Sequence, residues 1–397
     1  DVTATAPRMI GKTVRIPAPE ISEEDEGVLR LNFFERSLLR GFFSFEGKTM
    51  DLDQTIYLDH ASATPVRREV LDKMLPILCH FTGDSAGVHA HARRTGVLIE
   101  EARRAVQDCL GAEEGRVYFS ESGSRAAEEA ILGLARVRGG GHIVTSVDED
   151  SGVLAACQSL EGQGFRVTYL EPDSRGDLSL EVVAGALSED SVLLTLSGVN
   201  RYTGCRRPIE QLSALCRSRG VAFHLEWSLG CLWDIDLALV DLLTLSSHLI
   251  GGPQGLGVLC VGEGVEIVPS GLESDNLANI VGFAQALCFW TDERSDRIAY
   301  LQGLRTELLR LLKVQLPWLY LPTGEFHPAV LSLEVPGVSA RDLVYQLDRW
   351  GVCALDTPYG IRFSLGTTTT SQELGRAVVA LAGAIRCCRQ LAGEVAA

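Results

Sequence analysis

The sequence predicts an α/β protein with a large three-layer α/β/α domain, built on a parallel sheet, and a smaller C-terminal α+β domain. Continuous apolar segments separated by helical patterns lie at residues 117–119, 142–145, 166–170, 192–196 and 221–225. Such segments are typical of a parallel sheet that is buried on both faces. After about residue 265 the pattern changes to long helical stretches such as 297–314, with later strands near 329–333 and 361–364.

We therefore expect the large domain to span residues 56–265 and the small domain residues 266–397. Residues 1–55 differ from both and form an N-terminal extension. Within it, apolar side chains recur at helical spacing at Phe34, Leu38, Phe42 and Phe45. An apolar stripe of this kind predicts an arm that packs on its own chain or docks on a partner chain.

Composition narrows the classes of function. The 397 residues are 46% hydrophobic, and no run of about 18 uncharged apolar residues predicts a membrane span. The net charge of −16 and the pI near 5.0 make direct nucleic-acid binding a poor expectation. The eleven cysteines include no Cys-x-x-Cys pair, so we expect reduced thiols and no metal site.

Seven short motifs occur in order along the chain. They lie at residues 57–65, 83–89, 203–209, 224–226, 246–257, 276–283 and 361–366. Together they resemble the cysteine desulfurases, which depend on pyridoxal phosphate and have the fold-type I aminotransferase architecture. The resemblance covers about residues 56–390. It implies that fold, that cofactor and a dimer whose active sites are completed across the interface.

The resemblance also implies a lysine directly after a Ser-x-His motif, where it forms a Schiff base with the cofactor aldehyde. Residues 246–248 are Ser-Ser-His, and the next residue is Leu249. Leucine has neither a nucleophilic amine nor a titratable proton. The imidazole that should stack on the cofactor ring is likewise replaced, by Asp150, and a carboxylate offers no aromatic face.

Two further chemical groups depart from the family pattern. Glu226 holds the position of the carboxylate that pairs with the ring nitrogen, but Trp227 and Leu229 replace a small residue and a glutamine, which predicts a filled pocket. The nucleophilic cysteine should lie on a flexible loop. Residues 352–360 instead run almost directly into the following strand, so we expect Cys353 to be a buried structural thiol.

The predicted phosphate cradle is partly kept. Ser124, Ser246 and His248 are potential donors to a phosphate group, whereas Arg125 and residues 271–274 depart from the pattern. These three donors, with Glu226 and Arg362, are the vestigial cradle of the sequence.

Arg362 matches the arginine that clamps the substrate carboxylate. Because the groups it would serve are replaced, we expect it to form a structural salt bridge with Glu226 or Asp150. Arg201 and Tyr202 replace an Asn-Glu pair in the same cleft and are expected to fill space or to pair with these carboxylates.

These features predict a catalytically inactive cysteine-desulfurase-like protein, with no catalytic residue and no bound cofactor, that is a structural or regulatory subunit of a larger assembly. We expect protein partners, as a homodimer, a heterodimer with an active paralogue or a subunit of a large mitochondrial complex. The chain starts at Asp1, as a processed precursor would. Mitochondria are therefore the expected location, and the cytoplasm is the alternative.

Two other functions stay open. One is an enzyme that uses pyridoxamine phosphate or non-covalent pyridoxal phosphate, with His248 as the base in place of the lysine. The other is a sensor that binds a small anion through Ser124, Ser246 and His248.

Overall fold

A computed structural model describes residues 55–395 except residues 82, 113–114, 270–273 and 323–325, together with two short strands that precede them. The chain divides into two compact units, residues 1–55 and 56–397. In the first unit, β1 (Ser44–Phe45) pairs antiparallel with β2 (Lys48–Thr49). Phe45 therefore lies in a strand, whereas Phe34, Leu38 and Phe42 of the predicted stripe lie outside the described residues.

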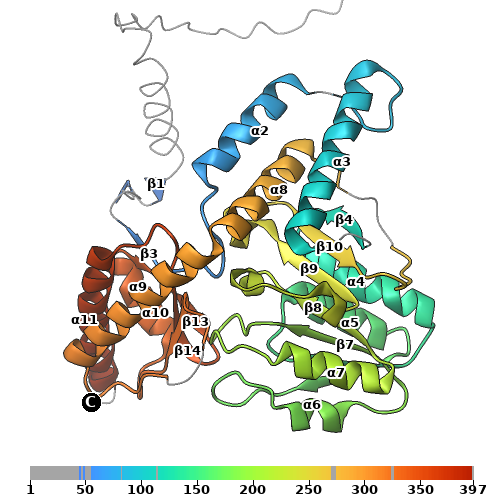
Figure 1. The fold of residues 1–397 in the computed structure, drawn as a ribbon. Coiled ribbons are helices and arrows are strands. Elements are labelled where there is room, and N and C mark those ends of the chain that lie inside the picture. Colours follow the sequence, from blue (N-terminus) through green and yellow to red (C-terminus); the bar gives the residue numbers. More distant parts are fainter. Residues whose placement is uncertain are drawn as a thin grey trace, which may run out of the picture. The chain divides into compact units, whose positions relative to one another are not determined.

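A seven-stranded sheet forms the centre of the second unit (Figure 1). In sheet order its strands are β4 (Arg116–Ser120), β10 (Gly257–Val261), β9 (Leu242–Ser246), β8 (Ala222–Glu226), β7 (Ser191–Ser197), β5 (His142–Ser146) and β6 (Arg166–Leu170). The predicted α/β architecture is confirmed.

One strand departs from the predicted parallel arrangement. Strands β5 to β9 pair in parallel, but β10 is antiparallel to both β4 and β9. The physical reason is the connection between β9 and β10, which spans residues 247–256. A return to a parallel strand needs a crossover of about a dozen residues or more, usually with a helix. The sheet is therefore mixed.

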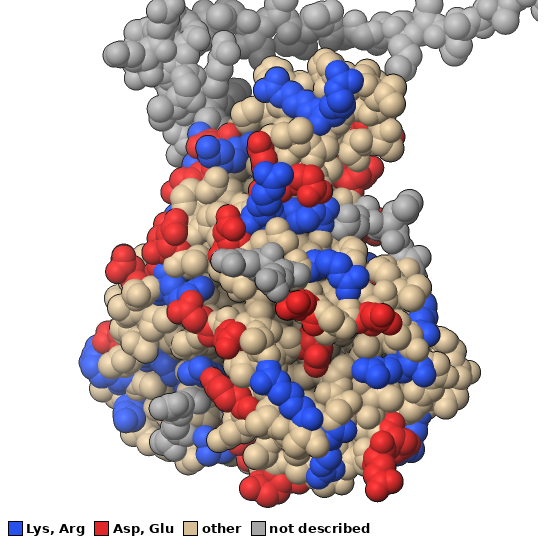
Figure 2. Space-filling view, turned by 45° about the vertical axis from the view of Figure 1, so that its right-hand side comes forward, with Lys and Arg blue, Asp and Glu red and all other residues tan. Residues whose placement is uncertain are grey.

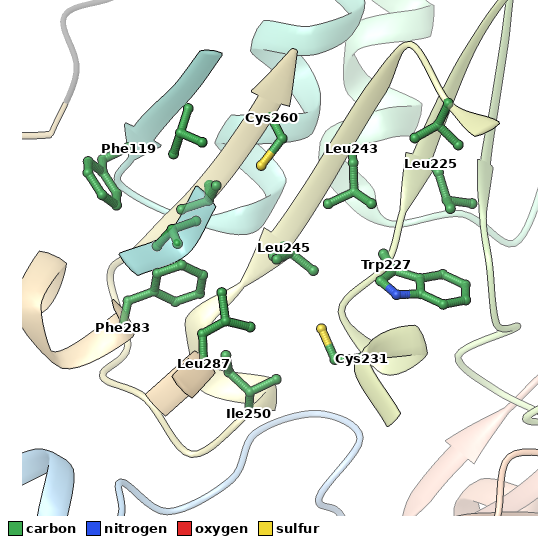
Figure 3. Close-up of a cluster of buried hydrophobic side chains, with 14 of the residues drawn as sticks. Phe119, Leu225, Trp227, Cys231, Leu243, Leu245, Ile250, Cys260, Phe283 and Leu287 are labelled. Atoms are coloured by element: carbon green, nitrogen blue, oxygen red, sulfur yellow. The ribbon is translucent and has the colours of Figure 1, made fainter. Parts of the chain in front are cut away.

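Helices cover both faces of this sheet. Strand residues such as Val144, Leu194 and Phe223 pack with α2 (Arg68–His80), α3 (Ala90–Leu110), α6 (Leu180–Ala186), α7 (Ile209–Arg219) and α8 (Leu277–Asp292). Figure 3 shows part of this cluster, with Phe283 and Leu287 of α8 facing Leu245 of β9. On the other face, Ile143 and Leu193 pack with α4 (Gly123–Arg138) and α5 (Ser151–Glu161). The two clusters account for the three layers.

The small domain has a core of its own. Strands β11 (Val330–Leu333), β14 (Gly360–Ser364) and β13 (Leu355–Thr357) form an antiparallel sheet, which packs with α9 (Arg294–Gln315), α10 (Ala340–Arg349) and α11 (Ser371–Val395). Strand β3 (Ile56–Tyr57) pairs in parallel with β12 (Val352–Cys353), and Ile56 is buried in this core. The first strand of the second unit, β3, is therefore held in the small domain by its pairing with β12 and by the burial of Ile56.

Among the described residues, no helix combines the length and the apolar character that are needed to cross a membrane. On the face drawn in Figure 2, acidic and basic side chains are interspersed.

Candidate functional site

The sequence-predicted site residues gather where the parallel strands end. Asp150 follows β5, Asn200 follows β7, Glu226 ends β8 and Ser246 ends β9. Since parallel strands end at one edge of a sheet, this is the edge at which α/β proteins bind ligands. Ser124 lies in the first turn of α4, beside the same edge.

Helix α4 approaches this edge very closely. A Cβ on Gly123 would meet Oγ of Ser246 at 1.7 Å, so only glycine can occupy the first position of the helix. Ser122 caps the helix, because its hydroxyl accepts a hydrogen bond from the amide of Arg125. Ser246 and the start of α4 are therefore brought together as the sequence predicted.

Asp150 accepts hydrogen bonds from several of these groups. Its Oδ1 accepts from the hydroxyl of Ser124 at 2.6 Å and from the amide of Gly152 at 2.9 Å, which caps α5. Its Oδ2 pairs with the guanidinium of Arg201 at 3.0 Å. The prediction that Arg201 pairs with one of the site carboxylates is confirmed. The Ser124 hydroxyl is thus committed to a carboxylate of the same chain.

Glu226 is held by its own turn. The amide and the hydroxyl of Ser228 both donate to Oε1, the amide at 3.0 Å. Burial raises the pKa of Glu226 to about 7, against the lowering effect of the Ser228 hydrogen bonds. Asp150 and Glu149 raise it further. Near neutral pH this carboxyl is therefore partly protonated.

Leu249 ends a short 3-10 turn, Ser247–Leu249, that directly follows β9. The carbonyl of His248 accepts hydrogen bonds from the amide and the hydroxyl of Thr64, both at 2.8 Å, which fixes the turn. Burial lowers the pKa of the His248 imidazole, so it is neutral near pH 7. The Leu249 side chain is half-buried and faces a cavity beside the cradle.

Arg362 forms a structural salt bridge, but the partner differs from the prediction. Its Nη2 donates to Oδ1 of Asp59 at 2.5 Å and to the hydroxyl of Ser62 at 2.6 Å. Its Nη1 donates to the carbonyl of Arg201 at 2.8 Å. The pairing with Glu226 or Asp150 was wrong because Asp59, just after β3, lies beside β14 and pairs there with Ser364.

Trp227 does not fill the predicted pocket. Trp227 is 4% exposed, and its ring lies in the hydrophobic cluster shown in Figure 3. A Cβ on Gly198 would meet the ring at 2.4 Å and one on Gly230 at 2.2 Å, so two glycines make room for it. Successive residues of a strand point to opposite faces of the sheet, and Trp227 therefore points away from the cradle side of Glu226. Leu229, by contrast, lines the cavity beside Leu249.

Cys353 lies in a strand rather than on a loop. It belongs to β12 and pairs with Tyr57, is half-buried, and has a pKa that burial raises. The segment that follows is a tight hairpin, in which β13 pairs with β14 in the register Thr357↔Gly360. At its tip, the hydroxyl of Tyr359 donates to Asp148 at 3.3 Å. The expected short connection agrees with this geometry, whereas Cys353 is half-buried and not buried as predicted.

Asp148 and Asp59 are site residues that the sequence reasoning missed. Asp148 receives the Tyr359 hydroxyl and the side-chain amide of Asn200, and it lies 3.5 Å from the guanidinium of Arg207. It directly precedes the Glu149-Asp150 pair, which was the available signal. Asp59 lies within the 57–65 motif, but its partner is distant in sequence, so nothing local pointed to it.

The described residues do not fit pyridoxal phosphate held through a Schiff base. Leu249 offers no amine, and in residues 56–397 the only lysines are Lys73, on α2, and Lys313, near the end of α9. The hydroxyl of Ser124 is bonded to Asp150, whose negative charge would repel a phosphate. Across the described part of the chain, no group of three or more His, Cys, Asp and Glu side chains could hold a metal ion.

Comparison with known proteins supplies the context for this site. Residues 56–267 match the aminotransferase class-V family. The chain is 32% identical over 316 residues to the putative cysteine desulfurase IscS 1 of Bacillus subtilis, covering 75% of this chain and 83% of the relative. It is 29% identical over 364 residues to the cysteine desulfurase IscS of Dictyoglomus turgidum, covering 81% and 92%.

Solved structures show the same fold at lower identity. A NifS-like protein from Rickettsia africae aligns with a TM-score of 0.76 and 20% identity, covering 84% of this chain and 100% of that one. The apo cysteine desulfurase of Thermococcus onnurineus aligns with a TM-score of 0.73 and 19% identity, covering 84% and 95%.

Proposed function

Because the chain belongs to the aminotransferase class-V family, within its cysteine desulfurase (IscS/NifS) group, we propose that it is a catalytically inactive member that acts as a structural or regulatory subunit. The observation that carries this proposal is Leu249, at the end of the turn after β9. A Schiff base needs a primary amine in this place, and a leucine cannot supply one.

The neighbourhood of Leu249 supports the proposal. In a working cradle, the hydroxyl and amide donors at the start of α4 would be available for a phosphate group. Here the Ser124 hydroxyl donates to Asp150, and Arg201 pairs with the same carboxylate. The carboxylate of Asp150 therefore takes the hydroxyl donor that a phosphate group would use.

The region of the sulfur carrier supports it too. A persulfide carrier must move between the substrate and an acceptor, which requires a mobile loop. The β13–β14 hairpin is short, and its tip is hydrogen-bonded to Asp148 through Tyr359. Cys353 precedes this hairpin and is half-buried in β12, where burial raises its thiol pKa.

We propose protein partners rather than a substrate for this chain. A protein that keeps the fold without the Schiff-base and persulfide chemistry can belong to three kinds of assembly. These are a homodimer, a heterodimer with an active paralogue and a larger mitochondrial complex. The mass of the native assembly, measured by light scattering after size-exclusion chromatography, distinguishes a monomer from a dimer. Co-purification with a catalytically active paralogue would select the heterodimer.

His248 favours a second candidate function. Its imidazole is half-buried and makes no hydrogen bond with the described residues, while Ser246 and the start of α4 lie close by. A neutral imidazole in this position can accept a proton as a base, or donate a hydrogen bond to an anion through its N–H group. An enzyme that binds pyridoxal or pyridoxamine phosphate without a Schiff base, or a small-anion sensor, would use it in this way.

One experiment separates these functions. The purified protein is mixed with pyridoxal phosphate and cysteine, and the visible spectrum and sulfide release are measured. We expect neither a protein-bound cofactor band nor sulfide. A Leu249→Lys variant should also remain without bound cofactor, since Asp150 still blocks the cradle, and Leu78→Lys, at a position with 62% exposure, controls for reaction at a surface amine.

Sulfide release by the unmodified protein would overturn the proposal. A cofactor band without sulfide that disappears in a His248→Ala variant would favour the lysine-independent enzyme. Phosphate binding that depends on His248, without binding of pyridoxal phosphate, would favour the anion sensor.

A further inference from the structure

The small domain presents a group of aromatic side chains to solvent. Among the described residues, every tryptophan, tyrosine and phenylalanine that is more than 40% exposed lies in this domain. These side chains are 44–78% exposed, and they are Tyr300, Trp318, Tyr320, Tyr345 and Trp350. Tryptophan is highly buried on average, and Trp and Tyr are enriched at protein interfaces. Their exposure here therefore points to a surface that another molecule covers.

Two of these rings, those of Trp318 and Trp350, lie on helix α11. The ring of Trp350 covers Gly383, where an added Cβ would meet it at 2.9 Å. The guanidinium of Arg389 lies 4.5 Å from the centre of the Trp318 ring. Gly383 and Arg389 are six residues apart, which is a rise of about 9 Å along a helix. Both rings therefore belong to one surface.

Helix α11 turns one stripe of residues to solvent between these rings. Val379, Gly383, Arg386 and Gln390 are spaced by three or four residues and so share one side of the helix. Apart from Gly383, which Trp350 covers, they are exposed. In Figure 1, α11 lies on the side of the small domain away from the seven-stranded sheet. The opposite side of the helix is buried in the core, with Leu374, Ala377, Leu381, Ala384 and Ile385 at most 2% exposed.

We call the exposed side of this helix, together with the two rings that lie on it, the α11 surface. It consists of Trp318, Trp350, Val379, Arg386 and Arg389. Its apolar part is aromatic and its charged part is guanidinium. Trp and Arg are the residue types that most often dominate the binding free energy at protein interfaces.

The charge of α11 along this surface is positive. From residue 374 to residue 393 the helix carries three arginines, the third being Arg376, and no acidic residue. Arg386 and Arg389 form no ion pair with the described residues. Glu373 precedes this stretch and accepts hydrogen bonds from the amide and the hydroxyl of Thr370, at 2.7 and 2.8 Å. This carboxylate is therefore used to cap the start of the helix.

The neighbouring helix α10 does not reverse this charge. It carries Arg341 and Arg349, and in equal number Asp342 and Asp348. From the start of α9 to the C-terminus, residues 294–397 contain eleven Lys and Arg and nine Asp and Glu, whereas the whole chain has a net charge of −16. This part of the chain therefore has the opposite sign of net charge to the rest. Electrostatic complementarity then favours an acidic partner for it.

We propose that the α11 surface binds an acidic segment of a partner protein. The two tryptophan rings and Val379 contact its apolar side chains, and Arg386 and Arg389 pair with its carboxylates. A basic segment would be repelled by the two arginines. The inference deepens the proposed function and rests on it in one respect, that the chain belongs to an assembly. The cofactor spectrum and sulfide release test inactivity separately, so the failure of either proposal is distinguishable.

The test uses the full chain in its own cells, with photoreactive p-benzoylphenylalanine in place of Tyr320, which is 78% exposed and lies two residues after Trp318. After irradiation, mass spectrometry identifies the cross-linked peptides. We expect a segment of another protein that contains more Asp and Glu than Lys and Arg. The same photoreactive residue in place of Leu78, on α2, gives the background at an exposed position elsewhere and should not capture that segment.

Variants with the photoreactive residue at position 320 assign the binding to the α11 surface. Trp318→Ala and Arg386→Glu should each lower the cross-link yield at least about tenfold, whereas Arg386→Lys keeps the charge and should lower it less than about threefold. Arg138→Glu makes the same charge reversal at the exposed end of α4 and should leave the yield unchanged. Because Arg386 and Arg138 are exposed, both charge reversals should keep the circular dichroism of the unmodified protein.

Four outcomes at position 320 would overturn the proposal. They are no cross-link above the background at position 78, and capture of a second copy of this chain, of lipid or of a segment without an excess of acidic residues. Capture of an acidic segment with the same yield in Arg386→Glu and Trp318→Ala would also overturn it, because the α11 surface would then not hold that segment.

Discussion

Ser124 donates its hydroxyl to Asp150 across 2.6 Å, joining the first turn of α4 to the N-terminus of α5. Asp150 also caps α5 through Gly152 and pairs with Arg201, whose carbonyl accepts a hydrogen bond from Arg362. One carboxylate therefore connects two helices of the large domain to a side chain of the small domain. Asp150, at the position where the resemblance implies an imidazole that stacks on the cofactor ring, is bonded within the protein.

We predict that Asp150→Ala lowers the free energy of unfolding by about 1–2 kcal/mol, because it removes a helix cap, a hydroxyl partner and a partly exposed ion pair. Asp150→Asn keeps an oxygen that can accept from Gly152 and should lose less. Urea unfolding monitored by circular dichroism measures both changes. Asp236→Ala is the matched control, since Asp236 is exposed and caps only a short 3-10 turn.

If Asp150→Ala were no more destabilising than Asp236→Ala, the contacts with Ser124 and Arg201 would contribute nothing. The same variant also tests the cradle. With the internal carboxylate removed, inorganic phosphate should raise the melting temperature of Asp150→Ala more than that of the unmodified protein.

Local patterns predicted strands of the sheet but not the antiparallel β10, and the gathering of the site residues was an implication of the family resemblance. Apolar runs identified strands such as β7 and β8, and residues that follow parallel strands must meet at one edge. Contacts between distant segments were not predictable in this way. Arg362 needed a carboxylate, but the choice among Asp59, Asp150 and Glu226 depends on how β14 lies against the segment after β3.

Trp227 shows a second limit. Its size predicted a filled pocket, yet the direction of a side chain depends on strand register and not on its volume. Gly198 and Gly230 make room for the ring on the other face, and both glycines are visible in the sequence. The sequence alone does not show that these two glycines lie against the Trp227 ring, because the contact depends on the folded structure.

Glu226 predicts a specific pH dependence of stability. Burial raises its pKa from 4.5 to about 7, so the folded protein holds a proton that the unfolded chain releases at lower pH. The stabilisation is therefore complete below about pH 4.5 and is lost as the pH rises towards 7. Over this window Glu226 should account for a loss of roughly 3 kcal/mol at most, from about 1.4 kcal/mol per pKa unit.

The measurement compares urea unfolding of the unmodified protein and Glu226→Gln between pH 5 and 8. The unfolding free energy of the unmodified protein should fall relative to that of Glu226→Gln as the pH rises. Histidines that titrate in the same range are present in both proteins, so their contribution cancels in this difference. Glu100→Gln changes a side chain that is 54% exposed and should keep the unmodified pH profile. A constant difference between the unmodified protein and Glu226→Gln across this range would contradict the raised pKa.

Cys109 of α3 and Cys288 of α8 form a thiol pair at the contact between these helices (Figure 1). Their sulfur atoms are 3.2 Å apart, and both side chains are half-buried. The hydrogen bond from Cys109 lowers the pKa of Cys288 to about 7 and raises that of Cys109. Cys288 is thus partly a thiolate at neutral pH, beside a thiol that can be joined to it.

We predict that Cys109 and Cys288 form a reversible disulfide with a low-molecular-weight disulfide such as oxidised glutathione. The Cys288 thiolate attacks the reagent and releases one thiol, and Cys109 then displaces the second, so the protein loses two hydrogen atoms and the reagent gains them. Peptide mass spectrometry should find the cross-linked 109–288 pair, and dithiothreitol should reverse it. Cys109→Ser should leave Cys288 as a mixed disulfide, whereas Cys79→Ser, at an exposed thiol, should leave the cross-link intact. Independent modification of both thiols without a cross-link would show that the two helices hold the sulfur atoms too far apart in solution.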